Sequence, residues 1–231
     1  MNIYVHTPGR EFLWPYIKKA ASAHTLTDNA GEADVAIMVS STDIYTPGEL
    51  LLAAESTPTN PDSAWIGHES AFAAGCENCR TVILRCPNVI GTAMTGFPRE
   101  LAESIFRGTF FHFKGNEARV GAVHAADVAA AIAALAEMPT AEGIYNISDG
   151  ENPKLHDLAE AIAFRMNNKR ISTLSTKGQL WLGRLIYGKK RYRAYTTSRT
   201  FDCSRLCRTI DYRPTPTTEY LRTHVYDENS L

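Results

Sequence analysis

Two nearly continuous apolar runs limit the folds that this chain can adopt. They are DVAIMVSS at 34–41 and TVILR at 81–85. A strand with one face in water alternates apolar and polar residues, whereas a strand that is apolar at almost every position is buried on both faces. Such strands belong to parallel sheets covered by helices on both sides. The two runs therefore predict an α/β fold with a parallel central sheet.

The rest of the chain alternates between short strands and helices, as a layered α/β fold requires. Further strands are expected at 2–6, 24–28 and 143–148. Helices are expected at 11–23, 47–55, 64–76, 97–107, 127–137, 155–167 and 217–226. Asp127 is the expected N-cap of its helix. PNVIG at 87–91 predicts a turn, and the last sixty residues are less regular, with a basic-aromatic stretch, GKKRYRAY, at 188–195.

Composition and charge narrow the classes of function. The chain has 24 Lys and Arg against 25 Asp and Glu, a formal net charge of -1, which does not predict a nucleic-acid partner. No apolar run approaches the roughly 20 residues of a membrane span, so no membrane partner is expected. The first residues, MNIYVHTPGREF, lack the features of a signal peptide, and a cytoplasmic protein is the expectation.

The five cysteines are expected to be reduced thiols, because an odd number without an export signal does not predict a disulfide framework. Cys76 and Cys79 form a C-x-x-C pair, and Cys203 and Cys207 lie one helical turn apart. Neither pair has a flanking His. The cysteines are therefore interpreted as small buried side chains, and no metal site is predicted.

Five stretches of the chain, in this order, resemble one family. They are VSSTDIY at 39–45, LRCPNVIG at 84–91, VHAADVAAAI at 123–132, GIYNISDGENPKLHDLAEAI at 143–162 and FDCSRLCRTIDYRPTPTTEYL at 201–221. Together they resemble the extended short-chain dehydrogenase/reductases, the group of nucleotide-sugar epimerases and dehydratases. The resemblance implies a Rossmann-like domain over 1–150 and a small C-terminal substrate-type subdomain over 151–231, partly interleaved with it. It also implies NAD or NADP as cofactor.

Members of this family use a Ser, a Tyr and a Lys, the last two in the pattern Y-x-x-x-K. Ser41 matches the serine by its place in S-S-x-x-I-Y. The segment PDSAWIGHE at 61–69 places Trp65 at the tyrosine position and Glu69 at the lysine position. An indole has no acidic hydroxyl, and a carboxylate reverses the charge that lowers the phenol pKa. These two changes argue against the family's chemistry.

The family's cofactor loop, G-x-x-G-x-x-G, is also absent. The corresponding stretch, VHTPGREFL, has Gly9 as its only glycine, and Thr7, Gly9 and Arg10 are the candidates for a remaining anion-binding turn. Only 34 residues separate Thr7 from Ser41, where a complete member places three further strand–helix units at about 30 residues each. The shortened sheet has room for one short strand there.

The substrate half keeps more of the family's pattern. Asn88, Arg119 and Arg193 are the candidate substrate-binding residues: Asn88 matches an asparagine that contacts the substrate, and Arg193 belongs to a basic run where the family places a cation on phosphates. The alternatives are a turn asparagine for Asn88 and a solvated face for the run. His68 is a candidate substitute base.

We therefore interpret the chain as an epimerase-like protein that is catalytically impaired and retains nucleotide-sugar binding or an interaction role. The alternative is an active NAD(P)-dependent epimerase or reductase with rewired catalytic residues. The family habit also implies a homodimer through helices at 48–55 and 65–76.

Overall fold

The two apolar runs form the central pair of a parallel sheet. The computed structural model describes residues 1–166 and 170–223. Five strands lie in the order β2-β1-β3-β5-β9, and each neighbouring pair is parallel. They are β1 (Asn2–His6), β2 (Thr25–Thr27), β3 (Val35–Ser41), β5 (Arg80–Cys86) and β9 (Gly143–Asn146). Every residue of β3 is buried. The predicted Rossmann-like fold is confirmed, and β2 is the one short strand expected between residues 7 and 41.

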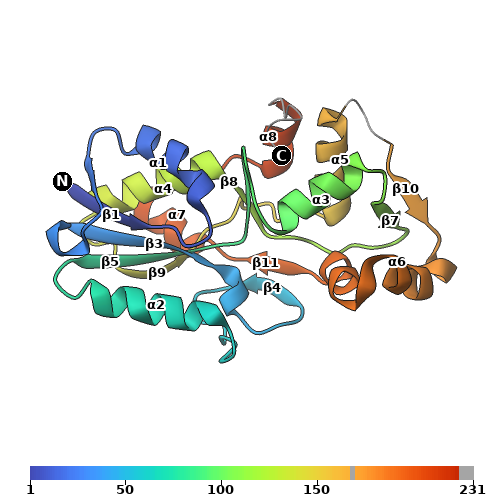
Figure 1. The fold of residues 1–231 in the computed structure, drawn as a ribbon, viewed down its shortest axis with the longest axis horizontal. Helices are drawn as coiled ribbons and strands as arrows, with labels where there is room; N and C mark the ends of the chain where they lie inside the picture. Colours follow the sequence, from blue (N-terminus) through green and yellow to red (C-terminus); the bar gives the residue numbers. More distant parts are fainter. Residues whose placement is uncertain (167–169, 224–231) are drawn as a thin grey trace.

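Helices cover both faces of this sheet (Figure 1). A short 3-10 turn, Glu11–Leu13, leads into α1 (Trp14–Ala20), which lies with α4 (Ala125–Glu137) and α7 (Ser204–Ile210) on one face. The opposite face is covered by α2 (Ala64–Gly75). Successive strand residues point to opposite faces, so Ile37 packs in the first core and Met38 packs under α2. The continuous apolar pattern of β3 is explained by this double burial.

A second lobe has a separate apolar core, and α3 and α5 pack together in it. Its elements are α3 (Phe97–Phe106), α5 (Leu155–Arg165), α6 (Thr176–Thr196), α8 (Thr217–Thr223) and the parallel pair β7 (Phe111–Phe113) and β10 (Ser172–Leu174).

Two further parallel pairs lie between the lobes: β4 (Leu50–Ala53) with β11 (Arg199–Phe201), and β6 (Asn88–Ile90) with β8 (Ala122–His124). Part of the second core, from Ile90 to Phe113, precedes residue 150 in the chain.

Two expected local structures are wrong for a shared reason. The helix expected at 47–55 is the strand β4, which pairs with β11 some 150 residues later. The turn expected at 87–91 contains the strand β6, which pairs with β8. Both segments are short, so pairing with distant strands overrides their local preference. A dimer interface made of two helices at 48–55 and 65–76 therefore lacks its first helix.

The ends of several helices differ from expectation. α4 begins at Ala125, and its N-cap is His124, whose Nδ1 accepts the Ala126 N–H. Asp127 instead lies in the first turn, and its carboxylate accepts the Thr215 N–H at 2.9 Å. The basic-aromatic stretch at 188–195 belongs to α6, which is kinked at Gly188 (φ 73°). Residue 167 of the predicted helix at 155–167, and residues 224–226 of the one at 217–226, lie outside the described residues.

Because Gly121 has no side chain, the Phe201 ring of β11 packs directly against its backbone. A Cβ built on Gly121 would lie 2.5 Å from Cδ2 of Phe201. We expect Gly121→Ala to lower the free energy of unfolding by about 1–3 kcal/mol, because the Phe201 ring must move out of a packed site. Gly67→Ala in α2 is the matched control. Nothing lies within 4 Å of its Cβ position, and the change is expected to stabilise by about 0.4–1 kcal/mol. Urea unfolding measures both, and a stable Gly121→Ala would contradict the close packing.

Candidate functional site

A cavity of about 940 Å³ lies at the carboxyl ends of the central strands and extends to the second lobe. Arg10 follows β1, Ser41 ends β3 and Pro87 follows β5, and all three line it. Ligands of open α/β sheets bind outside the carboxyl ends of the strands, where the order of the strands reverses. In this sheet the reversal lies between β1 and β3. On its other side the cavity is lined by residues of α3 and α6.

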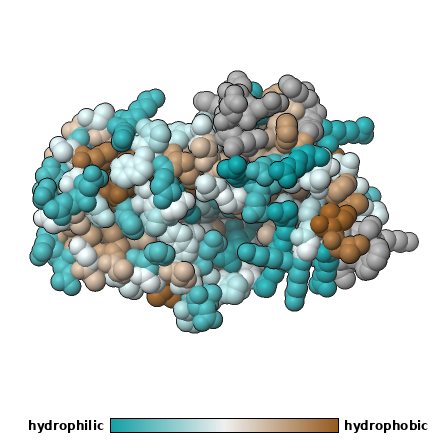
Figure 2. All heavy atoms as spheres, in the orientation of Figure 1, coloured by the Kyte–Doolittle hydropathy of each residue, from teal (hydrophilic) through white to brown (hydrophobic). Residues whose placement is uncertain are grey.

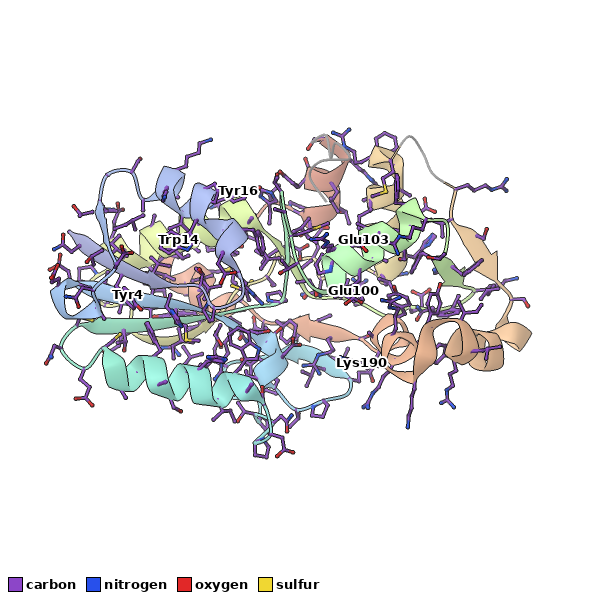
Figure 3. All side chains as sticks on the ribbon, in the orientation of Figure 1. Tyr4, Trp14, Tyr16, Glu100, Glu103 and Lys190 are labelled. Atoms are coloured by element: carbon purple, nitrogen blue, oxygen red, sulfur yellow. The ribbon has the colours of Figure 1, made fainter. Side chains whose placement is uncertain are left out.

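The lining of the cavity is rich in cations. Its charged residues are Arg10, Lys189, Lys190, Arg191, Arg193 and Arg199 against Asp43 and Glu100. Arg191 pairs with Glu100 at 3.0 Å, so α6 is tied to α3; Figure 3 labels Glu100 on α3 and Lys190 on α6. The Arg199 guanidinium donates to three backbone carbonyls of the loop before β4. After these pairings, the cations still exceed the acids.

Arg10 lies at the carboxyl end of β5. Its Nη2 donates to the carbonyls of Cys86 and Pro87, at 3.1 and 3.3 Å. Its Nη1 is buried and has no hydrogen-bond partner among the described residues. A buried guanidinium nitrogen without an acceptor loses its hydration without compensation. Arg10 therefore suits a cavity that receives an anionic ligand.

The residues at the positions of the catalytic serine, tyrosine and lysine do not meet as a catalytic group. Ser41 and Trp65 line the cavity. The Ser41 Oγ accepts the Asp43 N–H at 3.1 Å and caps the 3-10 turn Thr42–Ile44. The Trp65 indole packs against the apolar clusters on the α2 side of the sheet. Glu69, one turn further along α2, is buried and does not line the cavity.

Glu69 forms a buried ion pair with Arg85 of β5. The guanidinium donates from Nε to Oε1 at 2.9 Å and from Nη2 to Oε2 at 2.7 Å. Ser40 Oγ donates to the same Oε1 at 2.6 Å. Ser40 and Arg85 are register partners on β3 and β5, so both side chains point to the α2 face. Both carboxylate oxygens of Glu69, the residue predicted at the family's lysine position, thus accept hydrogen bonds from neighbouring side chains.

The network continues from Arg85 to Tyr45. The guanidinium carbon lies 5.1 Å from the centroid of the Tyr45 ring. The Tyr45 hydroxyl donates to Asn146 Oδ1 at 2.6 Å, and Asn146 Nδ2 donates to the Ala53 carbonyl. These bonds join β9 to the β4 segment beneath the cavity. Arg85 and Tyr45 were not identified by sequence, although an arginine within a buried strand signals a buried acidic partner.

Burial works against proton transfer by Tyr45 and Tyr187, the two tyrosines among the described residues of the cavity lining. Burial raises the pKa of Tyr45 above its usual value, with Arg85 acting in the opposite direction. Burial also raises the pKa of Tyr187 to about 12. General acid–base catalysis by a phenol requires a pKa lowered toward the working pH. His68, the candidate substitute base, is exposed on α2 and does not line the cavity.

The side chain of Glu11 accepts a hydrogen bond from the turn that follows β1. The Gly9 N–H donates to Glu11 Oε1 at 3.2 Å, and the Arg10 N–H donates to the Thr7 carbonyl. Pro8 has no N–H. A dinucleotide pyrophosphate needs free N–H groups at this turn, whereas here a carboxylate accepts from one of them. The residues present therefore do not fit NAD or NADP in the manner of a glycine-rich loop.

The three predicted substrate-binding residues are divided between the cavity and the scaffold. Asn88 and Arg193 line the cavity. Asn88 Nδ2 also donates to the Gly121 carbonyl at 2.8 Å and links β6 to the start of β8. Arg119 is not among the lining residues, because its Nη1 is directed at the carbonyls of Glu151 and Asn152. The described residues contain no cluster of three or more metal-ligating side chains.

The ion pair between Glu69 and Arg85 is open to a direct test. We expect Glu69→Gln to lower the free energy of unfolding by about 3–5 kcal/mol, because it leaves the Arg85 charge buried without its counterion. The double variant Glu69→Leu/Arg85→Met removes both charges and should recover most of that loss. Glu77→Gln, an exposed glutamate just beyond α2, is the matched control, with an expected change within about 0.5 kcal/mol. A Glu69→Gln variant as stable as the parent in urea would refute the pairing.

Comparison with known proteins gives no match to any protein-family model or curated sequence, but many solved structures match. Human epimerase family protein SDR39U1 (isoform 2) with NADPH has 12% identity and a TM-score of 0.68, covering 96% of this chain and 98% of that chain. UDP-glucuronic acid 4-epimerase from Bacillus cereus in complex with NAD has 12% identity and a TM-score of 0.69, covering 97% of each chain. UDP-N-acetylglucosamine 4-epimerase from Methanobrevibacter ruminantium M1 in complex with UDP-N-acetylmuramic acid has 14% identity and a TM-score of 0.64, covering 96% of each. The chain therefore has the fold of the extended short-chain dehydrogenase/reductases.

Proposed function

We propose that this chain binds a nucleotide-sugar, or a closely related phosphate-bearing ligand, in its cavity and does not transfer hydride. The observation that carries the proposal is the ion pair of Glu69 with Arg85. The carboxylate stands where the family's chemistry needs a lysine, and its two oxygens already accept hydrogen bonds from Arg85 and Ser40.

Hydride transfer between a sugar and a nicotinamide must be balanced by movement of the hydroxyl proton. A phenol carries that proton only if a nearby cation lowers its pKa. Trp65 has no hydroxyl, and the pKa values of Tyr45 and Tyr187 are both raised by burial. The alternative of an active enzyme with rewired residues requires a different proton carrier. The Ser41 hydroxyl is in the cavity, but it is engaged as a cap to the next turn.

The class of ligand follows from the charge and shape of the cavity. Arg10, Lys189, Lys190 and Arg193 line one space of about 940 Å³, large enough for a nucleotide-sugar. Phe97 and Tyr187 offer aromatic surface in the same lining. Two of the solved structures with this fold hold such ligands, a UDP-N-acetylmuramic acid complex and a UDP-glucose complex.

Calorimetric titration with UDP-glucose tests the proposal. We expect saturable binding to the unaltered protein and an affinity lower by about 10- to 100-fold in Arg193→Gln, because one charge-assisted contact to phosphate is lost. Arg208→Gln, an exposed arginine on α7, is the control and should bind as the parent does.

Two outcomes would overturn this proposal. Absence of binding across a panel of UDP-sugars and free UDP would contradict the proposal that the cavity binds a nucleotide-sugar or a related phosphate-bearing ligand. The second experiment incubates these sugars with the protein and NAD or NADP and analyses the products. Turnover of any of them would contradict the proposal that the chain does not transfer hydride.

A further inference from the structure

Positive charge is concentrated in one continuous part of this chain. Residues 161–201 contain ten Lys and Arg and no Asp or Glu, although the whole chain has a formal net charge of -1. The remaining residues therefore carry a formal charge of -11. Such a division creates a local positive field that the overall charge conceals. α6 lies within this segment.

α6 has an inner side that packs on the second lobe. Gly183 is buried, and a Cβ there would lie 2.7 Å from the Tyr192 ring. The Tyr187 ring packs against Phe113, and its hydroxyl accepts the Phe111 N–H at 2.5 Å. This side is thus committed to the core of the lobe.

Several side chains of α6 on both sides of its kink at Gly188 are exposed, and we call this set the α6 outer face. It consists of Arg184, Leu185, Ile186, Lys189 and Lys190. Leu185 is 69% exposed and Ile186 is 46% exposed, and they are adjacent in the chain. Figure 2 shows apolar surface over α6 beside projecting hydrophilic side chains, and Figure 3 shows long side chains of α6 directed away from the molecule. The α6 outer face thus combines two exposed aliphatic side chains with three exposed cations.

We propose that the α6 outer face docks on an anionic lipid surface. Cations attract anionic headgroups, and a neighbouring aliphatic pair enters the boundary between headgroups and acyl chains. Nucleic acid fits less well, because aliphatic side chains neither stack on bases nor neutralise phosphate. No helix of the described residues is both long and apolar enough to cross a bilayer. In this proposal α6 lies on the surface of the bilayer.

Docking through this face would bring the cavity near the lipid. Lys189 and Lys190 belong both to the α6 outer face and to the cavity lining. A chain held at the bilayer by α6 therefore presents the α6 side of its cavity close to the headgroups. The proposal concerns the outer face alone and does not depend on which ligand the cavity holds.

Co-sedimentation of the full chain with vesicles tests the proposal. We expect binding to phosphatidylcholine vesicles that contain phosphatidylglycerol, weaker binding as salt is raised, and little binding to phosphatidylcholine alone. Lys189→Gln/Lys190→Gln should lower the partition coefficient about 30-fold, since each cation near the surface contributes attraction. Leu185→Ser/Ile186→Ser should lower it about tenfold or more.

Matched variants elsewhere on the molecule show whether binding to vesicles depends on the α6 outer face or on exposed charge and exposed aliphatic side chains in general. Lys18→Gln/Lys19→Gln, an exposed pair on α1, and Leu51→Ser, an exposed leucine of β4, should leave binding unchanged. Arg184→Gln, outside the cavity, supplies a further test of the outer face if the double variants melt at a lower temperature than the parent. The proposal is overturned by equal binding of all variants, by absence of binding to anionic vesicles, or by binding to an oligonucleotide in preference to vesicles.

Discussion

The buried charge of Arg85 constrains the region around the candidate site. A guanidinium in the middle of the sheet is strongly unfavourable without a counterion and full hydrogen bonding. Glu69 provides the counterion from α2, Ser40 provides a second bond to that carboxylate, and Tyr45 covers the guanidinium with its ring. α2 is thereby fixed against the sheet at the turn where a catalytic lysine would project. The same interaction occupies both carboxylate oxygens of Glu69, the residue that the sequence predicts at the family's lysine position.

The side of the cavity near β1 and the side near α6 carry different polar groups. Near β1, Glu11 accepts the Gly9 N–H, Pro8 has no N–H, and only the short β2 lies beyond β1 in the described sheet. On the side of the second lobe, cations of α6 face an open space. The side next to α6 therefore favours an anion, whereas at the β1 side the Gly9 N–H is taken by the Glu11 carboxylate and Arg10 is the cation that lines the cavity. The chain keeps the layered fold of the epimerases, and the two sides of its cavity carry different polar groups.

The sequence predicted the parts of this structure that depend on local pattern. The buried strands β3 and β5 and the helix α2 follow from apolar runs and helical spacing, whereas the alignment of Trp65 and Glu69 with the family's tyrosine and lysine stays a prediction. The strand β4 was missed because its register depends on β11, about 150 residues away, and no short-range signal reports that pairing. The partner of Glu69 was missed because helix and strand meet only in the folded chain. The basic stretch of α6 gave no periodic pattern, since a kink at Gly188 interrupts the helix.

We propose that the chain has no working dinucleotide site, and energy transfer from tryptophan to NADH tests this proposal most directly. Trp65 lines the cavity, so a nicotinamide bound there would accept its excitation energy. The account predicts no sensitised NADH emission at concentrations where UDP-glucose binds, in the parent protein and in Trp65→Phe alike. Saturable NADH emission on tryptophan excitation, in either protein, would contradict it.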